Sequence, residues 1–419
     1  MGNGIEQDVA AAPGTSAGRD GRVIALVGFA HGVSHFFHLL LPPLFPWLMA
    51  EFALSFSRIG LTMTLFFVVS GIGQALAGFL VDRWGALRVL LAGVGCFIAA
   101  GLALTLAQDF SQLLLVAALA GLGNCVFHPA DFSLLNQRVS PARLGHAFSI
   151  HGLSGNLGWA LAPLFMTGIA TLAGWRLAAL AAAGMALLAW LLLVWGRRDL
   201  QLPARAASGS AQAAGSPLAF LSVRPVWLCF GFFFLITCAF GAVQNFATPV
   251  LQHLYGLSLA VAASSLSLYL LGGAGGILLG GFLARQGGHE KIIARMLGLA
   301  AVLALLLASG LLPAWAAPGL MALIGFCTGI AGPSRDLLVR RVATSRFGQG
   351  AYGRIYGFVY SGLDAGLALA PLLFAGAMDS GRDVLVLLGI ALLQGLAILT
   401  VFGVGQSLHT LHAEGQGAG

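Results

Sequence analysis

The segment "GWALAPLF" at residues 158–165 returns as "GLALAPLL" at residues 366–373, with the proline in the same place. A second pair follows the same pattern, because "GFLVDRWGALRV" (78–89) aligns with "GFLARQGGHEKI" (281–292). The two offsets are 208 and 203 residues, so the register is nearly constant. A nearly constant offset over most of the chain indicates that one structural unit occurs twice.

The composition predicts that both copies lie in a membrane. The 419 residues are 58% hydrophobic and only 8% charged, whereas soluble domains carry about 25% charged residues. Apolar runs of about 20 residues, enough to cross the hydrocarbon layer as a helix, recur along the chain without the alternating polarity of strands. We predict an all-α integral membrane protein with twelve transmembrane helices, at about 23–49, 57–81, 88–107, 111–137, 144–170, 175–195, 225–251, 257–284, 292–311, 316–340, 352–377 and 384–405.

The longest polar interruption divides these helices six and six. Residues 197–224, "RRDLQLPARAASGSAQAAGSPLAFLSVR", have the Ala/Gly/Ser/Pro content of a flexible linker. The predicted organisation is therefore a pseudo-symmetric pair of six-helix bundles at 23–196 and 225–406, joined by this linker. Short tails at 1–22 and 407–419 complete the chain.

The basic charge of the chain follows its predicted topology. Most Lys and Arg residues fall in the loops on the side of the N-terminus, and only Arg58, Arg176 and Arg382 fall in the opposite loops. This asymmetry predicts that both termini lie in the cytoplasm. The net charge of +7 is thus a topology signal, and no nucleic-acid partner is expected. The N-terminal segment lacks the pattern of a cleaved signal peptide.

Two parallel six-helix halves resemble the architecture of the major facilitators. The loop at 78–88 also resembles their loop 2–3 signature, with Gly78, Asp82, Arg83, Gly85 and Arg88 in its positions. The resemblance implies that these residues form a latch between the halves on the cytoplasmic side, and the alternative is a solvated turn. In the second half, Arg285 replaces the aspartate of this motif, so the mirrored latch is expected to be degenerate.

The first predicted helix carries a stripe of histidines. His31, His35 and His38 are spaced i, i+4 and i+7 and therefore share one helical face. Three interpretations remain open: lining of a substrate cavity, structural hydrogen bonds between helices, and a metal site. The chain has no H-E-x-x-H pattern, so a metal site needs ligands from another helix. Substrate binding is the prediction adopted for all three residues, and no metal or other cofactor is expected.

The fourth predicted helix adds His128, Pro129 and Asp131 within four residues. Ionisable residues are costly inside a membrane and usually face the interior of the bundle. A His–Asp pair can exchange a proton near neutral pH. In major facilitators the first and fourth helices of each half line the central cavity, so the resemblance implies that His128 and Asp131 converge with the stripe. We predict that Asp131, His128 and His35 couple transport to protons.

The second half carries different polar residues at the matching positions. Its proline, Pro333, is followed by Arg335 and Asp336, and Arg335 is a fixed cation suited to an anionic group. Gln244, Asn245 and Asp364 are further candidates for substrate binding. The alternative for Arg335 is an internal salt bridge with Asp336, Asp364 or Asp131.

The first half also resembles a narrower group, the fosmidomycin-resistance efflux proteins of bacteria. The matching segments are "SHF" (34–36), "EFALSFSRIGL" (51–61), "VFHPA" (126–130) and "GNLGWALAP" (155–163). That group tends to have Glu after the "FHP" proline, where this chain has Ala followed by Asp131. The resemblance covers roughly residues 30–170, and the second half matches at the level of the fold.

These patterns together predict a secondary active transporter and not an enzyme. The expected process is proton-coupled efflux of a small polar or amphiphilic, drug-like compound by alternating access in a bacterial inner membrane. The alternatives are uptake of a small organic anion, favoured by Arg335, and a metal-binding membrane protein. The proton gradient is the expected driving force, the partners are a small-molecule substrate and the lipid bilayer, and the chain is expected to be a monomer.

Overall fold

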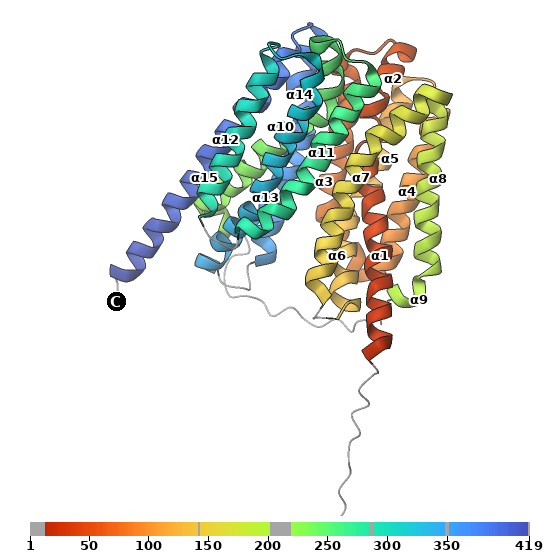
Figure 1. The fold of residues 1–419 in the computed structure, drawn as a ribbon. Coiled ribbons are helices and arrows are strands. Elements are labelled where there is room, and N and C mark those ends of the chain that lie inside the picture. The colour runs from red at the N-terminus through yellow and green to blue at the C-terminus, as the bar shows by residue number, and fades with distance from the viewer. Residues whose placement is uncertain (1–12, 141–142, 202–218, 285–287, 348–351, 418–419) are drawn as a thin grey trace, which may run out of the picture.

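The computed structural model describes residues 13–140, 143–201, 219–284, 288–347 and 352–417. Every regular element in these ranges is helical (Figure 1). The helices of the first half are α1 (Pro13–His38), η1 (Pro42–Leu44), α2 (Phe45–Phe52), α3 (Phe56–Trp84), α4 (Ala86–Leu106), α5 (Phe110–Asn124), α6 (Phe127–Arg138), α7 (Leu144–Ala173), α8 (Trp175–Trp195) and α9 (Arg197–Leu200). Those that follow are η3 (Ala219–Ser222), α10 (Arg224–Tyr255), α11 (Leu259–Leu283), α12 (His289–Ala308), η5 (Ala314–Ala316), α13 (Ala317–Phe347), α14 (Tyr352–Asp379) and α15 (Val384–Gly417).

The described helices supply the predicted twelve spans. Eleven stretches are long and apolar enough to cross a membrane by themselves, and a twelfth span forms if α1 continues through a bend of 41° into η1 and α2. Pro42 and Pro43 lie in this bend, where their missing N–H groups cannot continue the hydrogen bonds of α1. The all-helical fold with twelve spans is therefore confirmed.

The fourth span is broken where its counterpart in the second half is continuous. α5 ends at Asn124 and α6 begins at Phe127, and regular hydrogen bonding resumes with Ala130 N–H donating to Val126 O at 3.0 Å. Pro129 has no N–H with which to bond the carbonyl four residues earlier, so it removes one of the bonds that would join the two pieces. α13, in contrast, runs through Pro333 without a break. The same proline thus has different consequences in the two halves.

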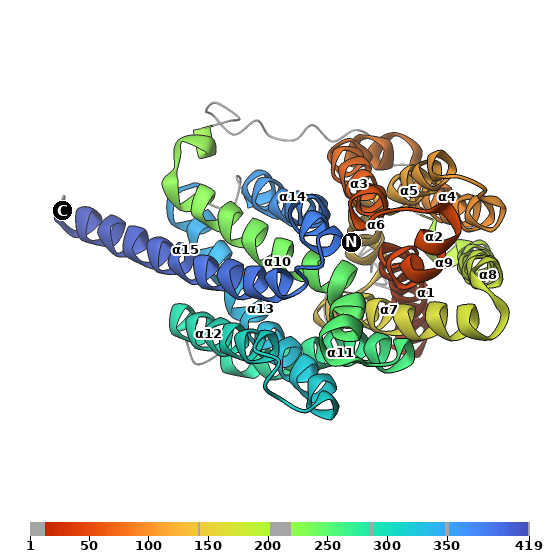
Figure 2. The same ribbon diagram turned by 90° about the horizontal axis from the view of Figure 1, so that it is seen from above.

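Helices of the first half pack on one another, and so do helices of the second half (Figures 1 and 2). In the first half α1 contacts α7 and α4 contacts α8, and in the second half α11 contacts α13 and α10 contacts α14 and α15. Residues 202–218 of the predicted linker lie outside the described part of the chain. The proposed boundaries of the two bundles and of the linker therefore stay a prediction.

The halves meet along α7 and α11 and along one end of α3 and α14. Thr64 Oγ1 donates to Ala368 O at 2.8 Å, and a Cβ added to Gly71 would lie 3.1 Å from Asp364 Cβ. Past Gly71 one face of α3 is uncovered, since Ile72 is 64% and Phe79 is 74% exposed, whereas Ala77 and Val81 are buried. Figure 1 shows the two bundles touching where α3 begins and separating toward the end that holds α6 and α9.

Candidate functional site

A carboxylate between two imidazole rings is the centre of the candidate site. Asp131 on α6 is fully buried, and its Oδ2 lies 3.0 Å from His151 Nε2 on α7 and 3.2 Å from His31 Nδ1 on α1. The rings of His31 and His151 are stacked, with centroids 3.5 Å apart. Three helices therefore place one acid and two bases within hydrogen-bonding distance.

The histidine stripe on α1 continues from this centre. The ring centroids of His31 and His35 are 4.4 Å apart, and those of His35 and His38 are 5.0 Å apart. All three side chains are buried. The His31 ring also lies 5.6 Å from that of His128, so the structure brings the stripe together with both polar residues of the fourth span.

Asp131 and His128 face different neighbours, which differs from the predicted pairing. His128 is half-buried and its Nδ1 lies 2.9 Å from Gln74 Oε1 on α3, whereas Asp131 is bonded by His151. Residues three apart on a helix are rotated by roughly 60° about its axis. That rotation is enough to direct one side chain toward α3 and the other toward α1 and α7.

His38 belongs to a second polar network, centred on Asn124 at the end of α5. His38 Nε2 lies 2.8 Å from Asn124 Oδ1, and Asn124 Nδ2 donates to Ser70 Oγ at 2.8 Å. Ser34 Oγ also contacts Asn124 Oδ1 at 3.4 Å. This network joins α1, α3 and α5 immediately before the break in the fourth span. The proposed role of His38 in substrate binding stays a prediction.

Small residues on α7 allow it to approach α1 closely enough for His151 to reach the stripe. A Cβ at Gly158 would lie 2.0 Å from Gly32 O, and one at Gly155 would lie 2.7 Å from the His35 ring. No side chain fits at either position without moving a helix. The glycines of "GNLGWALAP" are thus explained by close helix packing.

Trp159 separates the histidines from the second half. Its ring centroid lies 4.2 Å from that of His35 and 5.7 Å from that of His38. On the other side it meets Phe240 of α10 at 5.1 Å. An aromatic pair therefore closes the cluster toward the second half.

Sequence reasoning missed His151, Gln74, Asn124 and Trp159. His151 is alone on its face of α7, so no spacing rule identifies it. Only the packing of α7 on α1 places it beside Asp131. The available signal was a histidine within an apolar run, just before the segment 155–163 that was singled out for its resemblance.

Arg335 is paired inside the second half. Its Nε lies 2.9 Å from Asp336 Oδ1, and its guanidinium carbon lies 4.6 Å from the centre of the Phe233 ring. Tyr360 O–H also donates to Asp336 Oδ1 at 3.2 Å. The internal salt bridge with Asp336, one of the alternatives for Arg335, is thus the arrangement in this structure.

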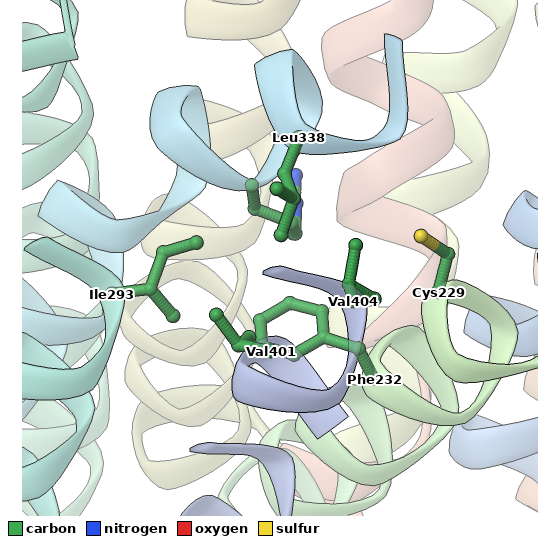
Figure 3. Close-up of a pocket in the computed structure, with 7 residues that line it drawn as sticks. Cys229, Phe232, Ile293, Leu338, Val401 and Val404 are labelled. Carbon is green, nitrogen blue, oxygen red and sulfur yellow. The ribbon is translucent and has the colours of Figure 1, made fainter. Parts of the chain in front are cut away.

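Arg335 also lines a cavity of about 10 Å³, which is at the lower limit for one water molecule. Figure 3 shows the apolar side chains that surround this cavity. They come from α10, α12, α13 and α15 and are Cys229, Phe232, Ile293, Leu338, Val401 and Val404. This cavity has no room for a substrate, and the role of Arg335 and Asp336 in substrate binding stays a prediction.

The other candidates of the second half lie on α10 and α14. Gln244 and Asn245 are buried, and Asn245 Nδ2 donates to Gly241 O at 2.7 Å. Gln244 Nε2 and Asn245 Oδ1 have no hydrogen-bond partner among the described residues. Asp364 lies against Gly71 of α3 at the contact between the halves. Their predicted contribution to substrate binding is not tested by this geometry.

The predicted latch residues form the turn between α3 and α4. Gly85 has a positive φ of 85°, which favours glycine, and its N–H donates to Val81 O at 2.9 Å. Gly78 lies in the last third of α3, and the side chains of Arg83 and Arg88 are exposed. The side chain of Asp82 and all of Arg285 lie outside the described part of the chain, so the latch stays a prediction.

Comparisons with known proteins agree with this fold. The model of the Major Facilitator Superfamily matches residues 25–371. A fosmidomycin resistance protein from Escherichia coli K12 is 35% identical over 156 residues, which are 37% of this chain and 38% of that protein. The chain therefore matches well under half the length of this relative.

Longer but weaker matches extend into the second half. An uncharacterized MFS-type transporter from Bacillus subtilis 168 is 25% identical over 72% of this chain and 74% of its own length. A 3-(3-hydroxy-phenyl)propionate transporter from E. coli K12 is 26% identical over 62% of each chain. A solved bacterial homologue of the lysosomal transporter Spinster, described as inward-facing and unoccupied, superposes with a TM-score of 0.68. At 14% identity, over 94% of this chain and 97% of that one, it shows the fold alone.

Proposed function

This chain belongs to the Major Facilitator Superfamily of membrane transporters, and we propose that it is a proton-coupled exporter of a small polar or amphiphilic compound. It would work by alternating access, in which two rigid halves expose a midplane site to each side of the membrane in turn. The proposal includes a bacterial inner-membrane location, cytoplasmic termini, a monomeric state and the proton gradient as driving force. No catalytic step is part of the process.

The single observation that carries proton coupling is the contact of Asp131 with His31 and His151. A buried ionisable group in a membrane protein is expensive and marks an ion or proton pathway. Asp131 Oδ2 lies 3.0 Å and 3.2 Å from two imidazole nitrogens, and imidazole gains and loses protons near neutral pH. His35 and His128 are the other titratable groups facing this centre. A proton taken up there neutralises the carboxylate.

Alternating access is supported by the unequal contact between the halves. They are joined where α3 begins and α14 ends and also between α7 and α11, and Figure 1 shows the two bundles apart at the end that holds α6 and α9. If the N-terminus is cytoplasmic, as the charge asymmetry predicts, the open end is the cytoplasmic one. The protein would then be in its inward-facing state, like the Spinster homologue with the same fold.

The drug-like cargo is inferred from the fosmidomycin resistance protein, a relative similar to the first half, which holds the histidine cluster. The fosmidomycin resistance protein is 35% identical to this chain over 156 residues. Fosmidomycin is therefore a rational first test compound. A second candidate is uptake of an organic anion, which the similarity to a 3-(3-hydroxy-phenyl)propionate transporter favours. Arg335 would bind the carboxylate of the substrate, and for this it must first break its salt bridge with Asp336.

Transport by purified protein in liposomes tests the proposal. A pH gradient should drive accumulation of fosmidomycin or a related compound, and Asp131→Asn should abolish the gradient-driven part. The matched control is Asp383→Asn, which removes the carboxylate of a similar but more exposed His–Asp pair, His253 Nδ1 to Asp383 Oδ2 at 2.9 Å. Gradient-driven transport that survives Asp131→Asn would contradict the assignment of the proton site.

Counterflow separates the two candidate cargoes. If aromatic carboxylates exchange across the membrane and Arg335→Gln abolishes that exchange, uptake of an organic anion replaces efflux as the function. Exchange that persists in Arg335→Gln, or no exchange at all, favours efflux.

A further inference from the structure

We infer that His31, Asp131 and His151 form a binding site for one divalent transition-metal ion. The inference deepens the proposed function, on which it rests for the expectation that solutes reach this cluster. The described residues contain a group of one ligand atom from each of these three side chains, all within 4.8 Å of one another. Two imidazoles and one carboxylate are the ligand types of a three-ligand zinc site that keeps a fourth position open.

The distances suit coordination after a small adjustment. Ligand atoms bound at about 2.0–2.2 Å to a tetrahedral zinc ion lie about 3.3–3.6 Å from one another. Asp131 Oδ2 is 3.0 Å from His151 Nε2 and 3.2 Å from His31 Nδ1. Each of these two distances needs to lengthen by only a few tenths of an ångström to match tetrahedral coordination.

Two buried polar atoms of the cluster have no hydrogen-bond partner among the described residues, which supports a bound ion at this position. His31 Nδ1 lies close to the carboxylate but without the geometry of a hydrogen bond, and Asp131 Oδ1 has no hydrogen-bond partner among the described residues. Both atoms are buried, and buried polar atoms are normally satisfied. A metal ion between the three side chains would accept the lone pair of His31 and neutralise the charge of Asp131.

The stacking of the two rings also favours a metal ion over a doubly protonated cluster. The centroids of His31 and His151 are 3.5 Å apart, and two cationic rings at that separation repel each other strongly in a medium of low dielectric constant. Coordination uses neutral imidazole, which avoids this repulsion, and one of the stacked rings must turn so that both nitrogen lone pairs point at the ion. The net charge of the site then comes from the ion and one carboxylate.

A second group of candidate ligands shares His31 with the first. His31, His35 and His128 also offer ligand atoms within 4.8 Å of one another, and His31 is common to both groups. His35 Nδ1 is buried without a hydrogen-bond partner among the described residues. His35 and His128 are therefore further nitrogen ligands beside the proposed site.

The donor set selects the class of ion. Imidazole suits zinc, copper, iron and nickel, whereas calcium and magnesium require mostly oxygen ligands. The sequence predicted no metal because H-E-x-x-H is missing. That pattern concerns ligands on one helix, whereas the ligands here come from α1, α6 and α7.

Equilibrium binding to the full-length protein tests the inference. Protein purified in detergent without a polyhistidine tag is stripped with EDTA, dialysed and titrated with Co²⁺, a spectroscopic substitute for Zn²⁺. We expect one ion per chain, visible absorption bands of low-symmetry coordination, and displacement by Zn²⁺. Asp131→Asn and His151→Gln should each weaken binding by about tenfold or more. The control His253→Gln, at the exposed His–Asp pair, should bind as the wild type does.

A measurement on the wild-type protein alone guards against variants that fail to fold. Zn²⁺ should raise the unfolding temperature of the wild type, because a ligand that binds only the folded state stabilises it, and Mg²⁺ should not. Absence of stoichiometric Co²⁺ binding, or binding retained in both Asp131→Asn and His151→Gln, overturns the inference. Proton-driven transport in the presence of EDTA is scored separately. Proton-driven transport by a protein that binds no metal rejects the metal site and leaves the proposed function unaffected. Metal binding by a protein that shows no proton-driven transport rejects proton coupling alone.

Discussion

Ser57, in the first turn of α3, donates its backbone N–H to Asp379 Oδ2 at 2.9 Å, across 322 residues of sequence. The Ser57 hydroxyl bonds the same oxygen, and the N–H of Phe56 donates to Asp379 Oδ1 at 2.5 Å. N–H groups at a helix start have no partner within the helix and favour a negative charge. The last residue of α14 therefore caps the first turn of α3 and joins the two halves.

Replacing Asp379 should shift the protein toward the state in which this end is open. Asp379→Ala removes three hydrogen bonds to one carboxylate, and hydrogen bonds to charged groups are among the stronger ones. We expect the ratio of open to closed molecules at this end to rise roughly tenfold. Distances between spin labels on the ends of α3 and α14 would measure this ratio.

Asp383→Ala is the matched control, because Asp383 pairs with His253 within the second half. It should leave the distance distribution unchanged. If Asp379→Ala gives the same distribution as the wild type, the cap does not hold the halves together.

Gly158→Ala should destabilise the first half. Its Cβ would lie 2.0 Å from Gly32 O and 3.1 Å from the backbone N of Phe36, so α7 must move away from α1. Overpacking of this kind is destabilising, and we expect the unfolding midpoint in detergent to fall by roughly 5 °C or more. Gly168→Ala on the same helix is the control, because nothing lies within 4 Å of the added Cβ. Equal midpoints for the two variants would argue against close packing of α1 on α7.

Asn124→Leu should weaken the junction of α1, α3 and α5. The change leaves His38 and Ser70 without their partner, and a buried polar group left unpaired costs about 1–3 kcal/mol. We expect a lower unfolding midpoint in thermal denaturation. Asn136→Leu is the control, since Asn136 bonds only the carbonyl of Phe132 in its own helix and is exposed. A midpoint equal to that of the wild type would show that the network contributes little.

Trp159→Ala should open a route from the histidines to the second half. The Trp159 ring lies between the rings of His35 and Phe240. We expect faster proton leak through the protein in liposomes, followed with a pH-sensitive dye, and recovery of the seal in Trp159→Phe. Leak equal to that of the wild type in Trp159→Ala would mean that other residues close this path.

The sequence was sufficient for the spans, because their length and apolar character are local properties. It also identified His31, His35 and Asp131, which are expensive inside a membrane wherever they lie. It was insufficient for His151 and Trp159, since their importance depends on which helices pack together. Pro129 and Pro333 show the same limit, because one accompanies a broken helix and the other does not. The position of Arg335, against Phe233 and Asp336, likewise depends on packing.

The confinement of the histidine cluster to the first half has a consequence for transport. His31, His128, Asp131 and His151 all belong to α1, α6 and α7, so a rocking motion between rigid halves leaves their mutual distances unchanged. In such a motion, an ion or proton bound by the cluster would move together with the first half. Under the proposed alternating access, the contacts of the second half through Phe240 and α14 would determine which side of the membrane the bound ion or proton reaches.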